Sequence, residues 1–135
     1  MKNLIIIVIF SLLAIVGSAF SYDLWKNYCE YLDSAESMSS LQRMEKWKDF
    51  EGQRVTLSGI FKDAGYAING KDIYVSVDVD GRNVKVLVDK NNSMQVKRIV
   101  SLKKGEAVVC TGYFKSIGDL MHDVTLNNGS IVTGI

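Results

Sequence analysis

The chain has 135 residues, the size of a single domain, and is long enough to bury a core. Its charges nearly balance, with 16 lysine and arginine residues against 15 aspartate and glutamate residues. Because affinity for nucleic acid rests largely on neutralising phosphates, this balance argues against a nucleic-acid-binding domain.

The first 19 residues have the pattern of an export signal. Lys2 is followed by an apolar stretch over residues 4–16, interrupted by one serine, and then by three small residues that end at Ala19. This pattern predicts a secretory signal peptide cut after Ala19. The alternative is an uncleaved helix over residues 4–20 that contacts and anchors to the inner membrane. Both interpretations place the rest of the chain outside the cytoplasm, either periplasmic, secreted or anchored.

Residues 20–50 are predicted to form a helical lead-in. Apolar side chains recur there at steps of three or four, which is typical of an amphipathic helix. These side chains are Tyr22, Trp25, Tyr28, Cys29, Leu32 and Ala35. Ser21 or Asp23 is expected to cap the start of this helix, because short oxygen side chains accept from free helical amides. A second short helix is predicted over residues 41–47, with Ser40 as its cap.

The two cysteines allow two interpretations. In an oxidising compartment Cys29 and Cys110 can form a disulfide, or each can be a small buried apolar side chain. Two thiols and the single histidine do not make a zinc site, which needs clustered ligands. We therefore expect no metal and no cofactor.

From Gly52 the hydrophobic period changes to two, which predicts strands. The predicted strands cover residues 52–61, 73–79, 83–89, 105–114 and 121–127, and the tail 130–135 can extend the last one. A loop is expected over residues 63–71, and Asp80-Gly81 predicts a two-residue hairpin between the second and third strands. A helix between residues 91 and 103 is expected to pack through Met94, Val96, Ile99, Val100 and Leu102.

One ten-residue pattern occurs twice in these strands. GQRVTLSGIF, residues 52–61, and GEAVVCTGYF, residues 105–114, both read G-x-x-V-x-x-x-G-x-F. A glycine inside a strand often permits a bulge or a bend, so Gly59 and Gly112 are predicted to let their strands curl. Five short strands with a helix between the third and fourth is the layout of an OB-fold. We therefore predict a mainly β fold, a five-stranded Greek-key OB-fold barrel over residues 51–135 preceded by an amphipathic helix.

Two phrases in the chain carry a family resemblance. FEGQRVTLSGIF, residues 50–61, and LKKGEAVVCTGYF, residues 102–114, resemble the phrases that open the first and fourth strands in exported bacterial OB-fold proteins related to anticodon-binding domains. The resemblance covers about residues 47–127 and implies the fold. It supplies no catalytic residues. The cysteine that some of these proteins carry near the last strand is absent here, where Leu126 and Asn127 stand.

The expected binding surface follows from the predicted fold. OB-folds bind ligands across the outer face of strands two and three and with the loops between strands one and two and strands four and five. The candidate ligand-binding residues are Tyr66, Tyr74, Ser76, Asp78, Arg82, Lys85, Leu87 and Lys115. Their mixture of charges suits an envelope protein or a small polar ligand. The alternative is that they are ordinary solvated strand residues.

The sequence favours a non-enzymatic binding module of the cell envelope. His122 and Asp123 are neighbours on a predicted strand and point to opposite faces, so they form no catalytic dyad. One alternative is an inhibitor or immunity protein against an envelope-directed toxin or hydrolase. Another is single-stranded nucleic-acid binding, for which Tyr66, Tyr74, Arg82 and Lys85 would supply stacking and charge. Balanced charge and export make nucleic acid the less favoured partner.

Overall fold

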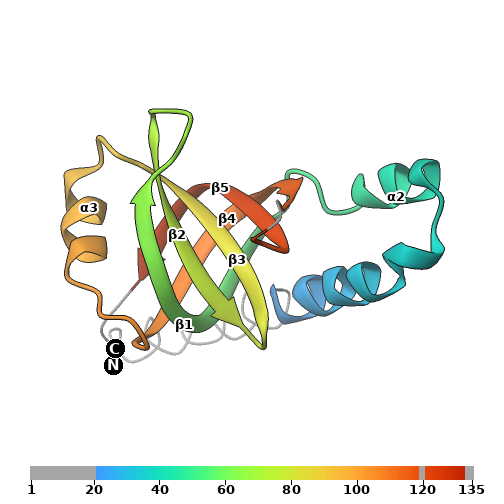
Figure 1. The fold of residues 1–135 in the computed structure, drawn as a ribbon, viewed down its shortest axis with the longest axis horizontal. Helices are drawn as coiled ribbons and strands as arrows, with labels where there is room; N and C mark the ends of the chain where they lie inside the picture. Colours follow the sequence, from blue (N-terminus) through green and yellow to red (C-terminus); the bar gives the residue numbers. More distant parts are fainter. Residues whose placement is uncertain (1–20, 119–120, 133–135) are drawn as a thin grey trace, which may run out of the picture.

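The computed structural model describes residues 21–118 and 121–132, in which five strands close into a barrel. The strands are β1 (Arg54–Tyr66), β2 (Asp72–Val79), β3 (Arg82–Asp89), β4 (Ala107–Ile117) and β5 (Val124–Val132). A helix over residues 21–34, the short η1 (Ala35–Ser37) and α2 (Ser40–Trp47) precede them, and α3 (Ser93–Val100) lies between β3 and β4. Figure 1 shows α3 at one end of the barrel and the 21–34 helix with α2 at the other. The predicted barrel architecture is confirmed.

The strand order around the barrel is β1-β2-β3-β5-β4. β1 pairs antiparallel with both β2 and β4, and β2 and β3 form the predicted hairpin around Asp80 and Gly81, which both have positive φ. β3 and β5 pair in parallel from Val84↔Val124 to Val86↔Leu126. This short parallel ladder closes the sheet, so neither β3 nor β5 is left as a fully exposed edge.

The doubled motif forms a pair of strands with itself. β1 and β4 run antiparallel with Leu57 opposite Cys110, and each motif places its valine opposite the other motif's inner glycine: Val55↔Gly112 and Gly59↔Val108. The outer positions repeat this symmetry. The Gly52 amide donates to the Phe114 carbonyl oxygen and the Gly105 amide to the Phe61 carbonyl oxygen, each at 2.9 Å. Equal spacing in the two motifs lets both ends of the ladder close in the same way.

Gly59 and Gly112 mark places where strands approach very closely. A Cβ at Gly59 would lie 2.3 Å from the Asp78 carbonyl oxygen of β2, and one at Gly112 would lie 2.8 Å from the Leu126 Cβ of β5. Gly112 also lies where the β4–β5 register shifts, between Thr111 and Tyr113. The predicted irregularity is seen at Gly112, whereas Gly59 pairs in regular register with β4 and the bulge of β1 follows Phe61. At both positions the close approach of the neighbouring strand leaves no space for a side chain.

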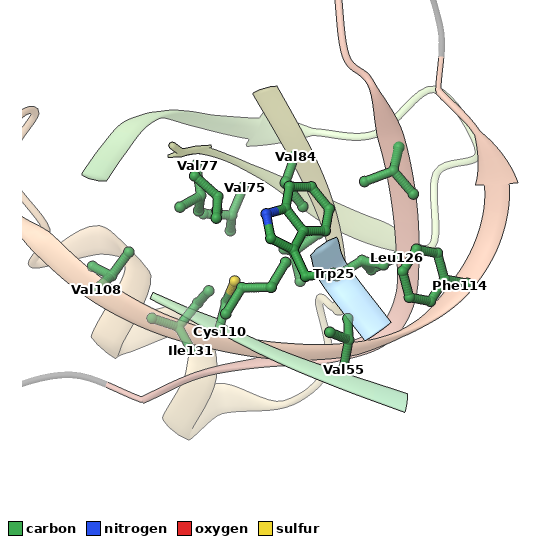
Figure 2. Close-up of a cluster of buried hydrophobic side chains, with 14 of the residues drawn as sticks. Trp25, Val55, Val75, Val77, Val84, Val108, Cys110, Phe114, Leu126 and Ile131 are labelled. Carbon is green, nitrogen blue, oxygen red and sulfur yellow. The ribbon is translucent and has the colours of Figure 1, made fainter. Parts of the chain in front are cut away.

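The core fills the barrel and is closed by the N-terminal helix. Val55, Val75, Val84, Val86 and Leu126 are fully buried inside the barrel. Figure 2 shows Trp25, which belongs to the 21–34 helix, lying among these barrel side chains. Further aromatic rings continue this cluster; they are Tyr28, which stacks on Trp25, and Tyr31, Trp47, Phe50 and Phe114, which pack in tilted or edge-to-face pairs, with centroid separations of 5.1–6.5 Å. The lead-in segment is therefore part of the barrel's core.

The N-terminal helices differ in detail from the prediction. Tyr22 is 66% exposed and Tyr31, which the prediction omitted, is buried in its place, because the buried stripe is centred on Trp25 and Tyr28. Ser21 and Asp23 both lie within the helical residues, and the Ser21 Oγ accepts from the Thr56 amide of β1. The cap of α2 is not Ser40 but Ser39, which forms a reciprocal capping box with Gln42.

Three barrel elements also differ from the prediction. β1 continues to Tyr66 through residues predicted as loop, because a bulge between Phe61 and Asp63 resets the alternation. β5 begins at Val124 and runs unbroken to Val132, with register shifts that accommodate its polar middle. In α3, Met94 and Val100 are exposed, and Gln95 is buried together with the predicted Ile99; the Gln95 side-chain amide pairs with the Ile131 backbone in both directions.

The predicted export signal over residues 1–19 and the alternative anchor over residues 4–20 lie outside the described residues. Within the ranges 21–118 and 121–132, the structure contains no helix that combines the length and apolar character needed to cross a membrane.

Candidate functional site

A cleft of about 440 Å³ lies on the outer face of β2 and β3. One wall is the end of β1 and the β1–β2 loop, and the other is formed by Met121 and His122, which precede β5. We call this the β2–β3 cleft. Its lining residues are Lys62, Asp63, Tyr66, Ala67, Ile68, Tyr74, Ser76, Asn83, Lys85, Met121 and His122. Its position matches the surface predicted from the fold.

Strand alternation places the floor of the cleft. Every second residue of β2, from Ile73 to Val79, is buried in the barrel, so Tyr74 and Ser76 point outward and are half-buried. On β3 the same alternation turns Lys85 outward between the buried Val84 and Val86. Ser76 and Lys85 are opposite each other in the β2–β3 register. The floor is therefore polar because it is the outer face of a half-buried sheet.

A short hydrogen bond joins the floor to the β4–β5 loop. The Ser76 Oγ and the His122 Nε2 lie 2.6 Å apart. The loop is compact at this point, since a Cβ at Gly118 would lie 1.9 Å from the His122 carbonyl oxygen. Next to His122, the Asp123 carbonyl oxygen accepts from the Tyr28 hydroxyl at 2.6 Å. The N-terminal helix therefore supports the loop that forms one wall of the cleft.

The Tyr74 ring packs over a glycine of the neighbouring strand. Tyr74 pairs with Gly65 across β1 and β2, and a Cβ at Gly65 would lie 2.9 Å from Tyr74 Cε1 and 3.0 Å from its hydroxyl oxygen. The ring therefore covers the glycine, and its hydroxyl lies 3.5 Å from the Asp63 Oδ2. Tyr66, at the end of β1, is 82% exposed at the lip of the cleft.

Four of the eight candidate binding residues line the cleft; they are Tyr66, Tyr74, Ser76 and Lys85. Asp78 lies beside it, where its carboxylate accepts from the Gly81 amide and lies 3.9 Å from the Lys62 Nζ. Its main local role is to stabilise the β2–β3 turn.

The other three candidates lie elsewhere. Arg82 forms an ion pair with Asp33 of the N-terminal helix, so its charge is used in docking that helix. Leu87 is only 5% exposed, which leaves no surface for a ligand, although it stands opposite Tyr74 in the register. Lys115 is exposed on β4 outside the cleft lining.

The prediction missed five polar or flexible residues of the lining. These are Lys62, Asp63, Asn83, Met121 and His122. Lys62 and Asp63 were absent from the candidate list, although the segment between the first two predicted strands was expected to frame the surface; the β1 bulge places both on the strand after Phe61. His122 and Asp123 were predicted to lie on a strand, but both lie in the β4–β5 loop before Val124, where the Asp123 carboxylate accepts from the backbone amide of Asn83. The contact of His122 with Ser76, 46 residues away in the sequence, carries no local signal.

The cysteines are free thiols and not a disulfide. Cys110 is buried in the barrel, and burial raises the pKa of its thiol to about 12. Burial also raises the pKa of Cys29, partly opposed by the nearby Arg82 guanidinium. Across the residues that the structure describes, no group of three or more His, Cys, Asp and Glu side chains is placed to hold a metal ion.

Comparison with known proteins gives structural matches alone. No family model matches the sequence, and no curated protein matches it. A Klebsiella pneumoniae protein assigned as a nucleic-acid-binding lipoprotein matches with a TM-score of 0.52 and 19% identity, over 75% of this chain and 97% of that one. The chain has an OB-fold.

Asparaginyl-tRNA synthetase from Pyrococcus horikoshii also matches this OB-fold, with a TM-score of 0.51 and 17% identity. That match covers 64% of this chain but 21% of the synthetase, so it concerns one part of the larger protein. At these identities the likeness extends to the fold and not to the chemistry of a site.

Proposed function

We propose that this protein is a non-enzymatic binding module of the cell envelope and that its ligand lies in the β2–β3 cleft. The observation that carries the proposal is the cleft itself. It has a polar floor around Ser76 and Lys85, a tyrosine seated on Gly65, and a wall made by a loop that is hydrogen-bonded to the floor. A concave site with a few convergent polar groups is the usual form of a small-ligand site.

Placement in the envelope rests on the first 19 residues and on one structural relative. The basic, apolar and small-residue segments of an export signal occur in order before Ser21. The matching Klebsiella pneumoniae protein is itself assigned as a lipoprotein. Mass determination of the protein recovered from cells tests the export step. A mature chain that begins at residue 20 supports a cleaved signal, whereas a full-length chain in the membrane fraction supports the anchor.

A binding role is favoured over catalysis by the way the polar groups are used. Ser76 and His122 are in hydrogen-bond contact, which alone would suit a nucleophile and its base. The Asp123 Oδ2, however, accepts from the backbone amide of Asn83, which holds that carboxylate against β3. The Ser76–His122 hydrogen bond links the β4–β5 loop to β2. This supports a structural role for the hydrogen bond within a binding site.

The proposal can be tested without knowing the ligand. Amide chemical shifts of the mature protein should be recorded with separate pools of monosaccharides and short oligosaccharides, nucleotides, and short peptides. We expect one pool to shift residues of the β2–β3 cleft, and Lys85→Ala to weaken that response while Lys97→Ala on α3 leaves it unchanged. Shifts confined to the hollow between the 21–34 helix and α2, lined by Glu30 and Lys46, would reject the cleft as the binding site.

Single-stranded nucleic acid is a second candidate. Tyr66 and Tyr74 lie in the same cleft as Lys62 and Lys85, and aromatic rings beside basic side chains are what such strands require. The name of the Klebsiella pneumoniae relative points in the same direction. Fluorescence anisotropy with a labelled thymidine oligonucleotide tests it. Binding that falls steeply as salt rises from about 50 to about 200 mM supports this candidate.

A further inference from the structure

The charges of the β2–β3 cleft nearly cancel. Among the lining residues that the structure describes, Lys62 and Lys85 are the lysines and Asp63 is the one carboxylate. Asp78 adds a second carboxylate 3.9 Å from the Lys62 Nζ. A phosphate backbone places a negative charge at every nucleotide, so it would meet repulsion from Asp63 along with attraction to the lysines. The cleft is thus poorly matched to a polyanion.

The polar groups of the cleft offer both hydrogen-bond donors and acceptors. The Asp63 carboxylate accepts hydrogen bonds, the side-chain amide of Asn83 both donates and accepts them, and Ser76 carries a hydroxyl. A polyhydroxylated ligand needs this mixture, because each of its hydroxyl groups is at once a donor and an acceptor. A purely anionic ligand would need donors alone.

The tyrosines supply apolar contact surface beside these polar groups. Tyr74 is held against Gly65, so its ring keeps one position, and Tyr66 stands 82% exposed at the lip. The C–H face of a pyranose ring is apolar while its edge carries hydroxyl groups. Such a ring can pack its face on a tyrosine while its edge hydrogen-bonds to the floor. The volume of about 440 Å³ is in the range that encloses a small organic ligand.

We infer that the β2–β3 cleft binds an uncharged or weakly charged oligosaccharide. The inference rests on the proposed function and specifies its ligand class. It predicts weak dependence on salt, since the affinity comes from hydrogen bonds and ring contacts and not from release of counterions. It also predicts that both tyrosines contribute.

The experiment uses the mature protein and three probes: chitotetraose, cellotetraose and a thymidine decanucleotide, each titrated by calorimetry at about 20 and about 200 mM salt. We expect at least one of the sugars to bind, with an affinity that changes less than about twofold between the two salt concentrations. Tyr74→Ala should weaken sugar binding by about tenfold. Tyr113→Ala, a partly exposed tyrosine on the outer side of β4, is the matched control and should have no effect.

Tyr66→Ala is a second test that still applies if Tyr74→Ala does not fold. Tyr66 is exposed, so its removal leaves the barrel core intact. Failure of both sugars to bind overturns the inference, as does sugar binding that both tyrosine variants leave unchanged. If the oligonucleotide alone binds, and shifts cleft residues, the proposed binding function stands while the oligosaccharide inference falls. If no probe binds and no pool of polar ligands shifts the cleft, the proposed function falls as well.

Discussion

Trp25 shows how one residue outside the barrel completes its core. The ring comes from the 21–34 helix and is 5% exposed among barrel side chains (Figure 2). Among the described residues, its indole Nε1 is the buried side-chain polar atom without a hydrogen-bond partner. An unmade bond of this kind costs about 1–3 kcal/mol, so Trp25 stabilises the fold through the burial of its large ring.

A pair of substitutions separates these two effects. Trp25→Phe removes the unpaired N–H and part of the ring, and we expect the free energy of unfolding to change by less than about 1.5 kcal/mol. Trp25→Ala removes the whole ring and should cost about 3–5 kcal/mol. Urea unfolding monitored by circular dichroism measures both. Equal losses in the two variants would mean that the N–H does form a bond that stabilises the protein.

Gly65 positions a residue of the β2–β3 cleft. An alanine Cβ there would lie 2.9 Å from the Tyr74 ring, so we expect Gly65→Ala to displace that ring. The chemical groups of the cleft are unchanged, and therefore any loss of binding comes from ring position. We predict a weakening of about tenfold for the ligand that shifts cleft residues, with a fall in unfolding free energy of about 1 kcal/mol. Ala107→Gly, at an exposed position on β4 outside the cleft lining, is the control and should leave the affinity unchanged. Unchanged affinity in Gly65→Ala would show that Tyr74 does not contact the ligand.

At the scale of elements, local patterns predicted the parts of the fold that depend on local spacing. Alternation of valines predicted β2 and β3 to within one residue, since both strands are regular and bury one face. The bulge after Phe61 and the polar middle of β5 depend on partner strands, so their extents could not be predicted from spacing. The same limit applied to the cleft, where the Ser76–His122 contact joins two distant elements.

The two inner glycines of the doubled motif allow a matched test of the barrel. Gly59→Ala places a Cβ 2.3 Å from a backbone oxygen of β2, whereas Gly112→Ala places one 2.8 Å from the Leu126 side chain. We expect both to destabilise the protein, and Gly59→Ala more strongly, by about 3 kcal/mol or more, because backbone yields less than a side chain. Thermal unfolding compares them, with Ala107→Gly on β4 as a variant that creates no clash. A milder effect for Gly59→Ala than for Gly112→Ala would contradict the proposed close approach.

At the scale of the whole molecule, the helices cover both ends of the barrel and leave its side open. The 21–34 helix lies at one end of the barrel and α3 at the other (Figure 1). The helix brings its aromatic cluster into the core, and α3 contributes the buried Ile99 and Gln95. The β2–β3 cleft lies on the side, next to the loop that receives the Tyr28 hydrogen bond. The N-terminal helix is therefore coupled to the candidate site through Asp123, the neighbour of His122.

Tyr28→Phe tests this coupling. The substitution keeps the buried ring and removes the hydroxyl that donates to the Asp123 carbonyl oxygen, so the loop loses one anchor. We expect a loss of about 1–2 kcal/mol in unfolding free energy and amide shift changes at Met121, His122 and Ser76. Tyr31→Phe, which removes a hydrogen bond to the Arg43 carbonyl oxygen, is the control and should leave the cleft shifts unchanged. If Tyr28→Phe perturbs α2 alone, the helix does not support the cleft.

Alkaline pH should destabilise the folded protein through its buried weak acids. Burial raises the pKa of Cys110 from 9.0 to about 12, and burial also raises the pKa of Tyr28 above its ordinary value. Below about pH 9 both groups are protonated in the folded and unfolded states, so their contribution to stability is complete. The unfolded chain releases the Cys110 proton above about pH 9 and the Tyr28 proton above about pH 10, while the folded chain retains both, and each difference favours unfolding by up to about 1.4 kcal/mol per pH unit. Cys110→Ala, measured by urea unfolding at several pH values, should lower stability near neutral pH but flatten the alkaline fall by up to that amount. Parallel alkaline profiles for the wild type and Cys110→Ala would mean that the Cys110 thiol is accessible to base in the folded barrel.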